Sequence, residues 1–200
     1  MSDAETIATY NAQGEKYASL VSKSEPDADL RHFLDTVTPG GDVLDLGCGP
    51  GNSAAMMRDA GLQVTATDAS EEMVRIARDT HKIDAQIATF DDLSGTDLYD
   101  GVWANFSLLH ALKLDMPRHL CAIHTALRAG GLFHIGMKTG TDAARDRLGR
   151  MYAYYTPPEL RGLLEQAGFT IETEREGRDK ALSGEVSPFV ILTARKANSL

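Results

Sequence analysis

The sequence contains few cysteines and has no long apolar run. Its 200 residues include two cysteines, Cys48 and Cys121, with no CxxC pair, so we expect no disulfide framework and take the cytoplasm as the default compartment. No apolar run approaches the roughly 18 residues of a membrane span, and residues 1–10 lack the apolar core of a signal peptide. We therefore expect a cytoplasmic protein that does not enter a membrane.

Basic residues are also in deficit. Lys and Arg number 20 against 29 Asp and Glu, which gives a formal net charge of −9. Broad nucleic-acid binding needs clustered Lys and Arg that face phosphates, so a nucleic-acid partner is not expected. A length of 200 residues, 42% of them apolar, fits one domain with a full-sized core. We expect residues 1–200 to form that single domain, and its oligomeric state stays open.

The stretch VLDLGCGPG at residues 43–51 predicts a buried strand followed by a glycine loop. Gly47, Gly49 and Gly51 allow a positive φ and let the backbone come very close to a ligand. Residues 52–60 are typical of a helix, whose free N–H groups point back over the loop. A strand, a glycine loop and a helix start together predict a pocket for a nucleotide-type ligand.

Two aspartates near this loop indicate which ligand it takes. Asp68 follows a second predicted strand, and an acid there can bind both hydroxyls of an adenosine ribose. Asp45 lies two residues before the loop, where a carboxylate would repel a diphosphate and suit a positive charge. Asn52 stands where the dinucleotide fingerprint G-x-G-x-x-G needs its third glycine. These features favour S-adenosylmethionine over NAD, unless Asp45 is a structural acid that binds backbone amides.

The loop resembles the first motif of the class I S-adenosylmethionine-dependent methyltransferases. Four later segments are similar to the motifs that follow it in this family: ATDAS at 66–70, ATFDDL at 88–93, YDGVWANFSLLHA at 99–111 and LRAGGLFHIGMK at 127–138. The resemblance spans roughly residues 7–195 and is specific for the cofactor but not for the methyl acceptor. It implies an α/β fold, a three-layer, doubly wound, Rossmann-like sheet of seven strands with the last strand antiparallel. Helices within residues 1–38 would cap it.

The same resemblance implies where the cofactor is held. An N-terminal helix would cover the pocket with Tyr10 and Tyr17, two helical turns apart on one face, although the two rings could equally be packing residues. Asp91 would meet the adenine amino group and Phe90 would stack on the ring, while Met73 could contact adenine or fill the core. The full set of predicted cofactor contacts is Tyr10, Tyr17, Asp45, Gly47, Cys48, Gly49, Gly51, Asp68, Ala69, Met73, Phe90, Asp91, Asn105 and Phe106.

The segment Asn105 to His110 follows the strand predicted at 99–105, so it lies near the transferable methyl group. His110 is the most suggestive titratable residue there. It could be a general base, with a reference pKa near 6.5, or it could merely pack the next turn. His119 and His124 are five residues apart rather than four, so a zinc site is not expected.

Residues 139–155 form a polar insertion after the fifth predicted strand and are the candidate lid over the acceptor. Arg147 and Arg150 could hold an anionic substrate, and Tyr152 and Tyr155 could line its pocket. The alternative is a solvated loop in which the arginines pair with nearby aspartates.

The sequence therefore predicts an S-adenosylmethionine-dependent methyltransferase that acts on an unidentified small molecule. Direct in-line displacement at the sulfonium methyl would leave S-adenosyl-L-homocysteine as the product, and no metal is expected. Three alternatives remain open at this point. They are an RNA base methyltransferase that uses the arginines at 145–150, an NAD-dependent oxidoreductase, and a protein that binds the cofactor without transferring its methyl group.

Overall fold

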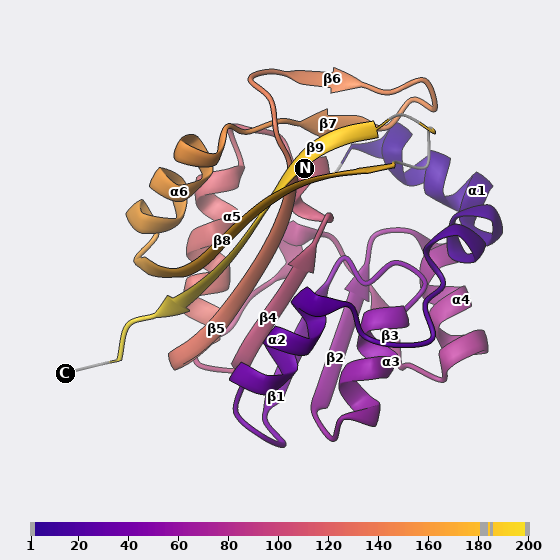
Figure 1. Ribbon diagram of the computed structural model, residues 1–200. Helices are drawn as coiled ribbons and strands as arrows, with labels where there is room; N and C mark the ends of the chain where they lie inside the picture. The colour runs from indigo at the N-terminus through magenta and orange to yellow at the C-terminus, as the bar shows by residue number, and fades with distance from the viewer. Residues whose placement is uncertain (1–2, 181–183, 185, 199–200) are drawn as a thin grey trace.

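A computed structural model describes residues 3–180, 184 and 186–198, and its centre is a seven-stranded sheet (Figure 1). The strands are β1 Asp42–Leu46, β2 Gln63–Asp68, β3 Ala85–Ile87, β4 Tyr99–Asn105, β5 Leu127–Lys138, β8 Phe169–Lys180 and β9 Val186–Lys196. They lie in the order β3-β2-β1-β4-β5-β9-β8. The strands from β3 to β5 run parallel, and β9 pairs antiparallel with both β5 and β8. The predicted sheet with an antiparallel last strand is thus confirmed.

Helices cover both faces of this sheet and make three layers (Figure 1). One face carries α2 Ala28–Thr36, α3 Asn52–Asp59 and α4 Glu71–His81, and the other carries α5 Met116–Ala126 and α6 Pro157–Gln166. The alternation of β1 shows why both faces are covered, because successive strand residues point to opposite sides. Val43 packs in the cluster of α2 and α3, whereas Leu44 packs in the cluster of α5 and α6.

Helix α1, Ala4–Val21, packs against α4. Its capping residue Asp3 accepts a hydrogen bond from the backbone N–H of Thr6 at 2.9 Å. Gly14 permits the close approach to α4, since a Cβ atom there would lie 2.5 Å from Cγ of Glu72. The helix is kinked at Gln13, where φ is −121° and ψ is 17°. It nevertheless keeps the predicted pair of tyrosines together.

The insertion predicted over residues 139–155 is folded rather than open. It contains a two-stranded antiparallel hairpin, β6 Ala143–Arg145 and β7 Met151–Ala153, which is separate from the main sheet. The hairpin lies at the same end of the sheet as α1 (Figure 1). Within the described part of the chain, none of the helices is long and apolar enough to cross a membrane.

Candidate functional site

A cavity of about 450 Å³ opens at the carboxyl ends of the parallel strands, beneath α1. This size suits a small organic ligand. Thirteen of the predicted site residues line it: Tyr10, Tyr17, Asp45, Gly47, Cys48, Gly49, Asp68, Ala69, Met73, Phe90, Asn105, Phe106 and His110. Six others do not line it: Gly51, Asp91, Arg147, Arg150, Tyr152 and Tyr155. The motif residues around the glycine loop therefore converge on one cavity, whereas those of the insertion stay outside it.

The glycine loop needs its glycines for two different reasons. Gly47 has a φ of 77°, and a Cβ atom there would lie 2.4 Å from Cβ of Ser107, which closes on the loop from the end of β4. Gly51 also has a positive φ, but it faces α4, where a Cβ atom would lie 2.9 Å from Cβ of Ala77. Gly51 thus serves the packing of α3 on α4, while Gly47 shapes the cavity floor.

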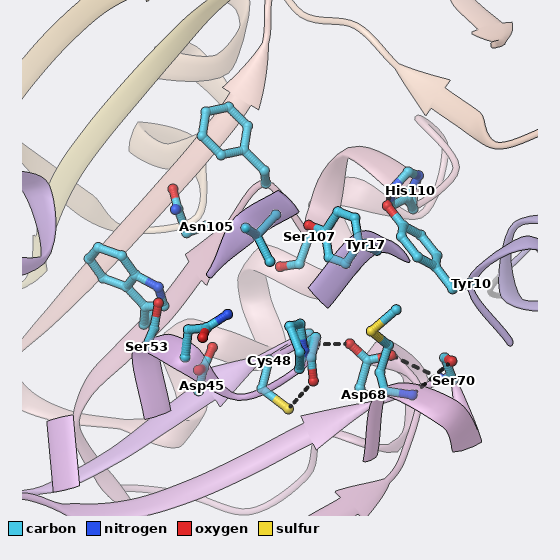
Figure 2. Close-up of a pocket in the computed structure, with 18 of the residues that line it drawn as sticks. Tyr10, Tyr17, Asp45, Cys48, Ser53, Asp68, Ser70, Asn105, Ser107 and His110 are labelled. Carbon is cyan, nitrogen blue, oxygen red and sulfur yellow. Dashed lines mark hydrogen bonds between the residues drawn. The ribbon is translucent and has the colours of Figure 1, made fainter. Parts of the chain in front are cut away.

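Asp68 joins the end of β2 to the glycine loop (Figure 2). Its Oδ2 accepts the Gly49 N–H at 2.8 Å, and its Oδ1 accepts the Ser70 N–H at 2.8 Å. Burial raises the pKa of Asp68, and these backbone hydrogen bonds act in the opposite direction. The Ala69 N–H also bonds this carboxylate, so three backbone groups hold it and part of its acceptor capacity is left for a ligand.

Asp45 lies deeper in the cavity and is 2% exposed (Figure 2). Burial, and then the neighbouring Asp68, raise the pKa of Asp45 to about 8. The backbone N–H of Ala54 binds this carboxyl group, but its Oδ2 has no hydrogen-bond partner among the described residues. Buried carboxyl oxygens are rarely left without a partner, so this oxygen is a candidate acceptor for a ligand. The arrangement suits a ligand that brings a cationic hydrogen-bond donor, and two adjacent carboxyl groups would repel a diphosphate.

The end of β4 supplies an amide and an aromatic ring. Asn105 Oδ1 lies 3.1 Å from Nε2 of His134, and because a carbonyl oxygen can only accept, His134 donates from Nε2. Burial lowers the pKa of His134 to about 3, so the ring is neutral. Phe106 has a φ of 55°, an uncommon value for a residue with a side chain, and its N–H donates to the Gly136 carbonyl. This backbone bend places Phe106 on the cavity wall.

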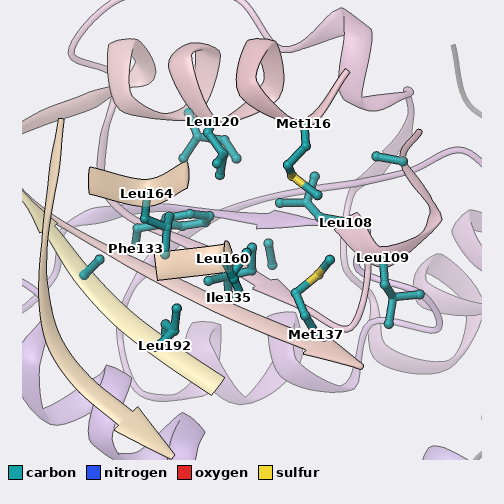
Figure 3. Close-up of a cluster of buried hydrophobic side chains, with 14 of the residues drawn as sticks. Leu108, Leu109, Met116, Leu120, Phe133, Ile135, Met137, Leu160, Leu164 and Leu192 are labelled. Atoms are coloured by element: carbon teal, nitrogen blue, oxygen red, sulfur yellow. The ribbon is translucent and has the colours of Figure 1, made fainter. Parts of the chain in front are cut away.

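His110 lies on the short helix η2, Leu108–His110, and its ring is bonded at both nitrogens. Leu108 and Leu109 anchor η2 in the apolar core beneath α5 (Figure 3). The Met151 carbonyl lies 2.6 Å from Nδ1 and can only accept, so Nδ1 carries the proton. Nε2 is therefore an acceptor, and the Tyr10 hydroxyl donates to it at 2.9 Å. Burial lowers the pKa of His110 to about 4, which keeps the ring neutral.

The predicted substrate residues of the insertion have other partners. The Arg150 side chain is 2% exposed and pairs with Asp146, with 2.6 Å between Nη2 and Oδ2. Arg147 is exposed on the hairpin, and Tyr152 and Tyr155 belong to the apolar core. The alternative in which an arginine of this insertion pairs with a nearby aspartate is therefore what the structure shows for Arg150.

The structure separates the neighbouring residues Phe90 and Asp91, which the sequence grouped together. Phe90, on the short helix η1 Phe90–Asp92, lines the cavity with its ring edge-on to His119. Asp91 turns away and accepts a hydrogen bond from Arg118 of α5 at 2.5 Å. The predicted contact of Asp91 with a ligand is thus not supported, whereas that of Phe90 is geometrically possible. In the part of the chain that the structure describes, no cluster of His, Cys, Asp and Glu is arranged to hold a metal ion.

Sequence reasoning missed several lining residues. Ser53, Trp103 and Ser107 face the cavity, and Asn11 joins α1 to its rim by accepting the Ser70 hydroxyl at 2.7 Å. Ser107 could have been found from its place between Asn105 and His110. Nothing in the local pattern marks the other three.

Comparisons with known proteins agree with this site. Residues 43–131 match the model of a methyltransferase domain. A trans-aconitate 2-methyltransferase of Rhodopseudomonas palustris is 30% identical over 160 residues, which make up 73% of this chain and 60% of the relative. The chain spans about half the length of the curated relatives it matches.

Two solved structures share the fold over nearly the whole chain. A Burkholderia thailandensis 1,6-didemethyltoxoflavin-N1-methyltransferase, solved with 1,6-didemethyltoxoflavin and S-adenosylhomocysteine, has a TM-score of 0.75 at 24% identity. The alignment covers 98% of this chain and 88% of the Burkholderia enzyme. The [4+2]-cyclase SpnF has the same TM-score at 19% identity, and the alignment covers 99% of this chain and 98% of SpnF. One fold thus carries differently named activities. The domain match and the predicted motifs in their predicted places make this chain a member of the class I S-adenosylmethionine-dependent methyltransferases.

Proposed function

We propose that this protein binds S-adenosylmethionine and transfers its methyl group to a small molecule. The observation that carries the proposal is the pair of aspartates at the glycine loop, of which Asp45 is buried and Asp68 half-buried. Asp68 is fixed at the end of β2 with acceptor capacity for a ribose diol, and Asp45 has a buried oxygen that lacks a hydrogen-bond partner among the described residues. S-adenosylmethionine offers a neutral ribose diol that can donate to Asp68 and an ammonium that can pair with Asp45, and it has a carboxylate but no phosphate.

The residues of the cavity suggest how such a reaction proceeds. When bound, S-adenosylmethionine supplies a methyl group that its positive sulfur already activates. Asp68 would hold the ribose, Asp45 the ammonium, and Phe90 with Met73 the adenine. The protein then has to align the acceptor with the methyl group and exclude water, both of which a cavity partly covered by α1 favours. The reaction is an in-line displacement that leaves S-adenosyl-L-homocysteine.

Two of the three alternatives from the sequence, the oxidoreductase and the RNA base methyltransferase, receive less support. A dinucleotide would need the loop amides for its diphosphate, but the Gly49 N–H already donates to Asp68. RNA would need cations that face its phosphates, but Arg145 is paired with Asp3 and Arg150 with Asp146. The size of the cavity suits a small-molecule acceptor, and the names of the trans-aconitate and toxoflavin enzymes also refer to small molecules.

The proposal is tested by ligand-dependent unfolding. S-adenosylmethionine at 100 times its dissociation constant should raise the free energy of unfolding by about 2.7 kcal/mol, since a ligand of the native state stabilises by mass action. S-adenosyl-L-homocysteine should act in the same way, and NAD at the same concentration should not. Stabilisation by NAD alone in differential scanning fluorimetry would refute the proposal.

A second expected result is that cofactor binding releases a proton. Asp45, with its pKa raised to about 8, is mostly protonated in the free protein at pH 7. An ammonium placed against the carboxylate would favour its ionised form, so about one proton should leave on binding at pH 7. Affinity should rise with pH up to about 8 and then level off. Calorimetry in buffers of different ionisation enthalpy measures the released proton, and Asp45→Asn, which cannot ionise, should show no such release.

A further inference from the structure

A chain of hydrogen bonds that cofactor binding does not explain runs along one wall of the cavity. Arg150 Nη1 donates to the Tyr10 hydroxyl oxygen at 3.0 Å. That hydroxyl lies 2.9 Å from Nε2 of His110, whose Nδ1 lies 2.6 Å from the Met151 carbonyl. Both ends fix the direction, because a guanidinium can only donate and a carbonyl can only accept. The Tyr10 proton therefore points at His110.

This chain leaves the Tyr10 oxygen with unused acceptor capacity. A hydroxyl oxygen has two lone pairs, and Arg150 occupies one of them. Tyr10 and His110 both line the cavity, whereas Arg150 stands behind them. Arg150 is itself held by Asp146, whose Oδ2 accepts from Nε at 3.0 Å and from Nη2 at 2.6 Å. The hairpin thus positions a tyrosine oxygen that can accept one more hydrogen bond from inside the cavity.

The charges around the cavity limit which acceptor can bring that hydrogen bond. Among the described residues of the lining, six are aspartates and the cationic side chains are Lys23 and Arg175. Lys23 pairs with Asp27 at 2.7 Å, and Arg175 donates from Nε to Asp29 at 3.0 Å. Both cations of the described lining are thus paired, so a carboxylate substrate would find no free positive charge there. The rings of Tyr17, Phe106 and Phe189 offer aromatic surface instead.

We propose that the methyl acceptor is an uncharged aromatic or heteroaromatic molecule with an N–H or O–H group, whose proton passes to Tyr10 as Tyr10 passes its own to His110. This inference rests on the proposed methyl transfer. It gives Tyr10 and His110 catalytic roles and makes Arg150 and Asp146 positioning residues. This uncharged acceptor differs in class from trans-aconitate, the carboxylate in the name of one relative.

The step balances in atoms and charge. The acceptor nitrogen or oxygen forms a bond to the methyl carbon, and the S–C bond breaks with its electron pair left on sulfur. The acceptor proton moves to the Tyr10 oxygen, and the Tyr10 proton moves to Nε2 of His110. The positive charge that the sulfur loses thus appears on the imidazole. The charged and aromatic groups around this ring are Asp146, Arg150, Lys138, Tyr10 and Tyr152. Because the pKa of His110 is low, the imidazolium then loses the proton to solvent after the reaction.

The proton path can be tested without any acceptor. In the ¹⁵N-labelled full chain bound to S-adenosyl-L-homocysteine, His110 should appear as the neutral tautomer protonated at Nδ1 at pH 7. Tyr10→Phe should shift the Nε2 resonance, because the hydroxyl that donates to it is gone. Arg150→Lys should move the same resonance, because lysine cannot make the guanidinium hydrogen bonds to both Tyr10 and Asp146. A tautomer protonated at Nε2, or an imidazolium, would overturn the path.

The acceptor class is tested with matched probes. Benzimidazole and 4-hydroxypyridine are compared with benzimidazole-5-carboxylate and trans-aconitate, with release of S-adenosyl-L-homocysteine as the readout. We expect turnover of neutral probes only, reduced roughly 10²-fold or more in Tyr10→Phe and His110→Asn. Calorimetric affinity for S-adenosylmethionine should be unchanged in His110→Asn, and Tyr99→Phe and His32→Asn should behave as wild type.

Three outcomes contradict the inference. They are turnover of the carboxylates but not of the neutral probes, no binding or turnover of either neutral probe, and wild-type turnover in both Tyr10→Phe and His110→Asn. Failure of S-adenosylmethionine to bind the wild-type protein is a different result, because it would refute the proposed function itself.

Discussion

Replacing Asp146 with alanine is expected to lower the free energy of unfolding by about 3–5 kcal/mol, the usual cost of breaking a buried ion pair from one side. The side chains of Arg150 and Asp146 are 2% and 8% exposed, so the guanidinium would stay buried without its counterion. Asp146 also accepts the backbone N–H groups of Leu148 and Arg150, at 2.9 and 3.1 Å. The turn of the hairpin would therefore lose its internal acceptor as well.

Urea denaturation measures this loss, provided that the m-value stays constant between variants. Arg147→Met is the matched control, because Arg147 is exposed on the same turn and its removal should cost at most about 0.5 kcal/mol. The double variant Asp146→Leu with Arg150→Met should recover much of the stability, since two apolar side chains leave no charge uncompensated. A loss below about 1 kcal/mol for Asp146→Ala would show that water reaches the Arg150 guanidinium.

The fold could be predicted because its signals are local and repeated. The run from Val43 to Gly51 specifies a buried strand and a loop of positive φ within nine residues, and the structure places both where expected. The positions of Asp45 and Asp68 at the cavity were predictable for the same reason, because each lies at a fixed distance in sequence from a glycine or a strand end.

The residues of the insertion were harder to place because their partners are remote in sequence. Arg150 bonds Tyr10, 140 residues away, and the Met151 N–H donates to the Thr6 hydroxyl at 2.8 Å. Spacing within residues 139–155 carries no information about α1. Asp91 illustrates the same limit at shorter range. Its neighbour Phe90 faces the cavity, but Arg118 from α5 draws Asp91 to the outside.

These remote contacts make α1 and the hairpin one structural unit over the cavity. Arg145 of β6 donates to both carboxylate oxygens of Asp3, each at 2.8 Å, and Thr9 donates to the Leu148 carbonyl at 3.0 Å. On its other side α1 is tied to α4 through Asn11 and Ser70. The insertion therefore supports two residues of the cavity, because Arg150 bonds Tyr10 of α1 and the Met151 carbonyl bonds His110.

The second large effect is expected at Asp68, where alanine should weaken S-adenosylmethionine binding by roughly 1.5–3 kcal/mol, the usual worth of hydrogen bonds to a charged group. This is a loss of about 10- to 150-fold in affinity. The effect has two parts, because the ribose would lose its acceptor and the Gly49 and Ser70 N–H groups would lose theirs. Asp84→Ala, an exposed aspartate just before β3, is the control and should bind as wild type.

Calorimetry of Asp68→Ala with S-adenosylmethionine, alongside urea unfolding of the free variant, separates the two parts of this effect. Burial already raises the pKa of Asp68, so the free protein stabilises this carboxylate only in part, and a ligand diol would add to the hydrogen bonds it accepts. If the loss of affinity in Asp68→Ala came only from the loop amides that lose their acceptor, affinity and stability would fall together. Asp68→Asn, which keeps an oxygen acceptor, would then restore both. If the ribose is bound as proposed, affinity should fall further than stability, and Asn should restore it only in part. Unchanged affinity in Asp68→Ala would remove this residue from the site.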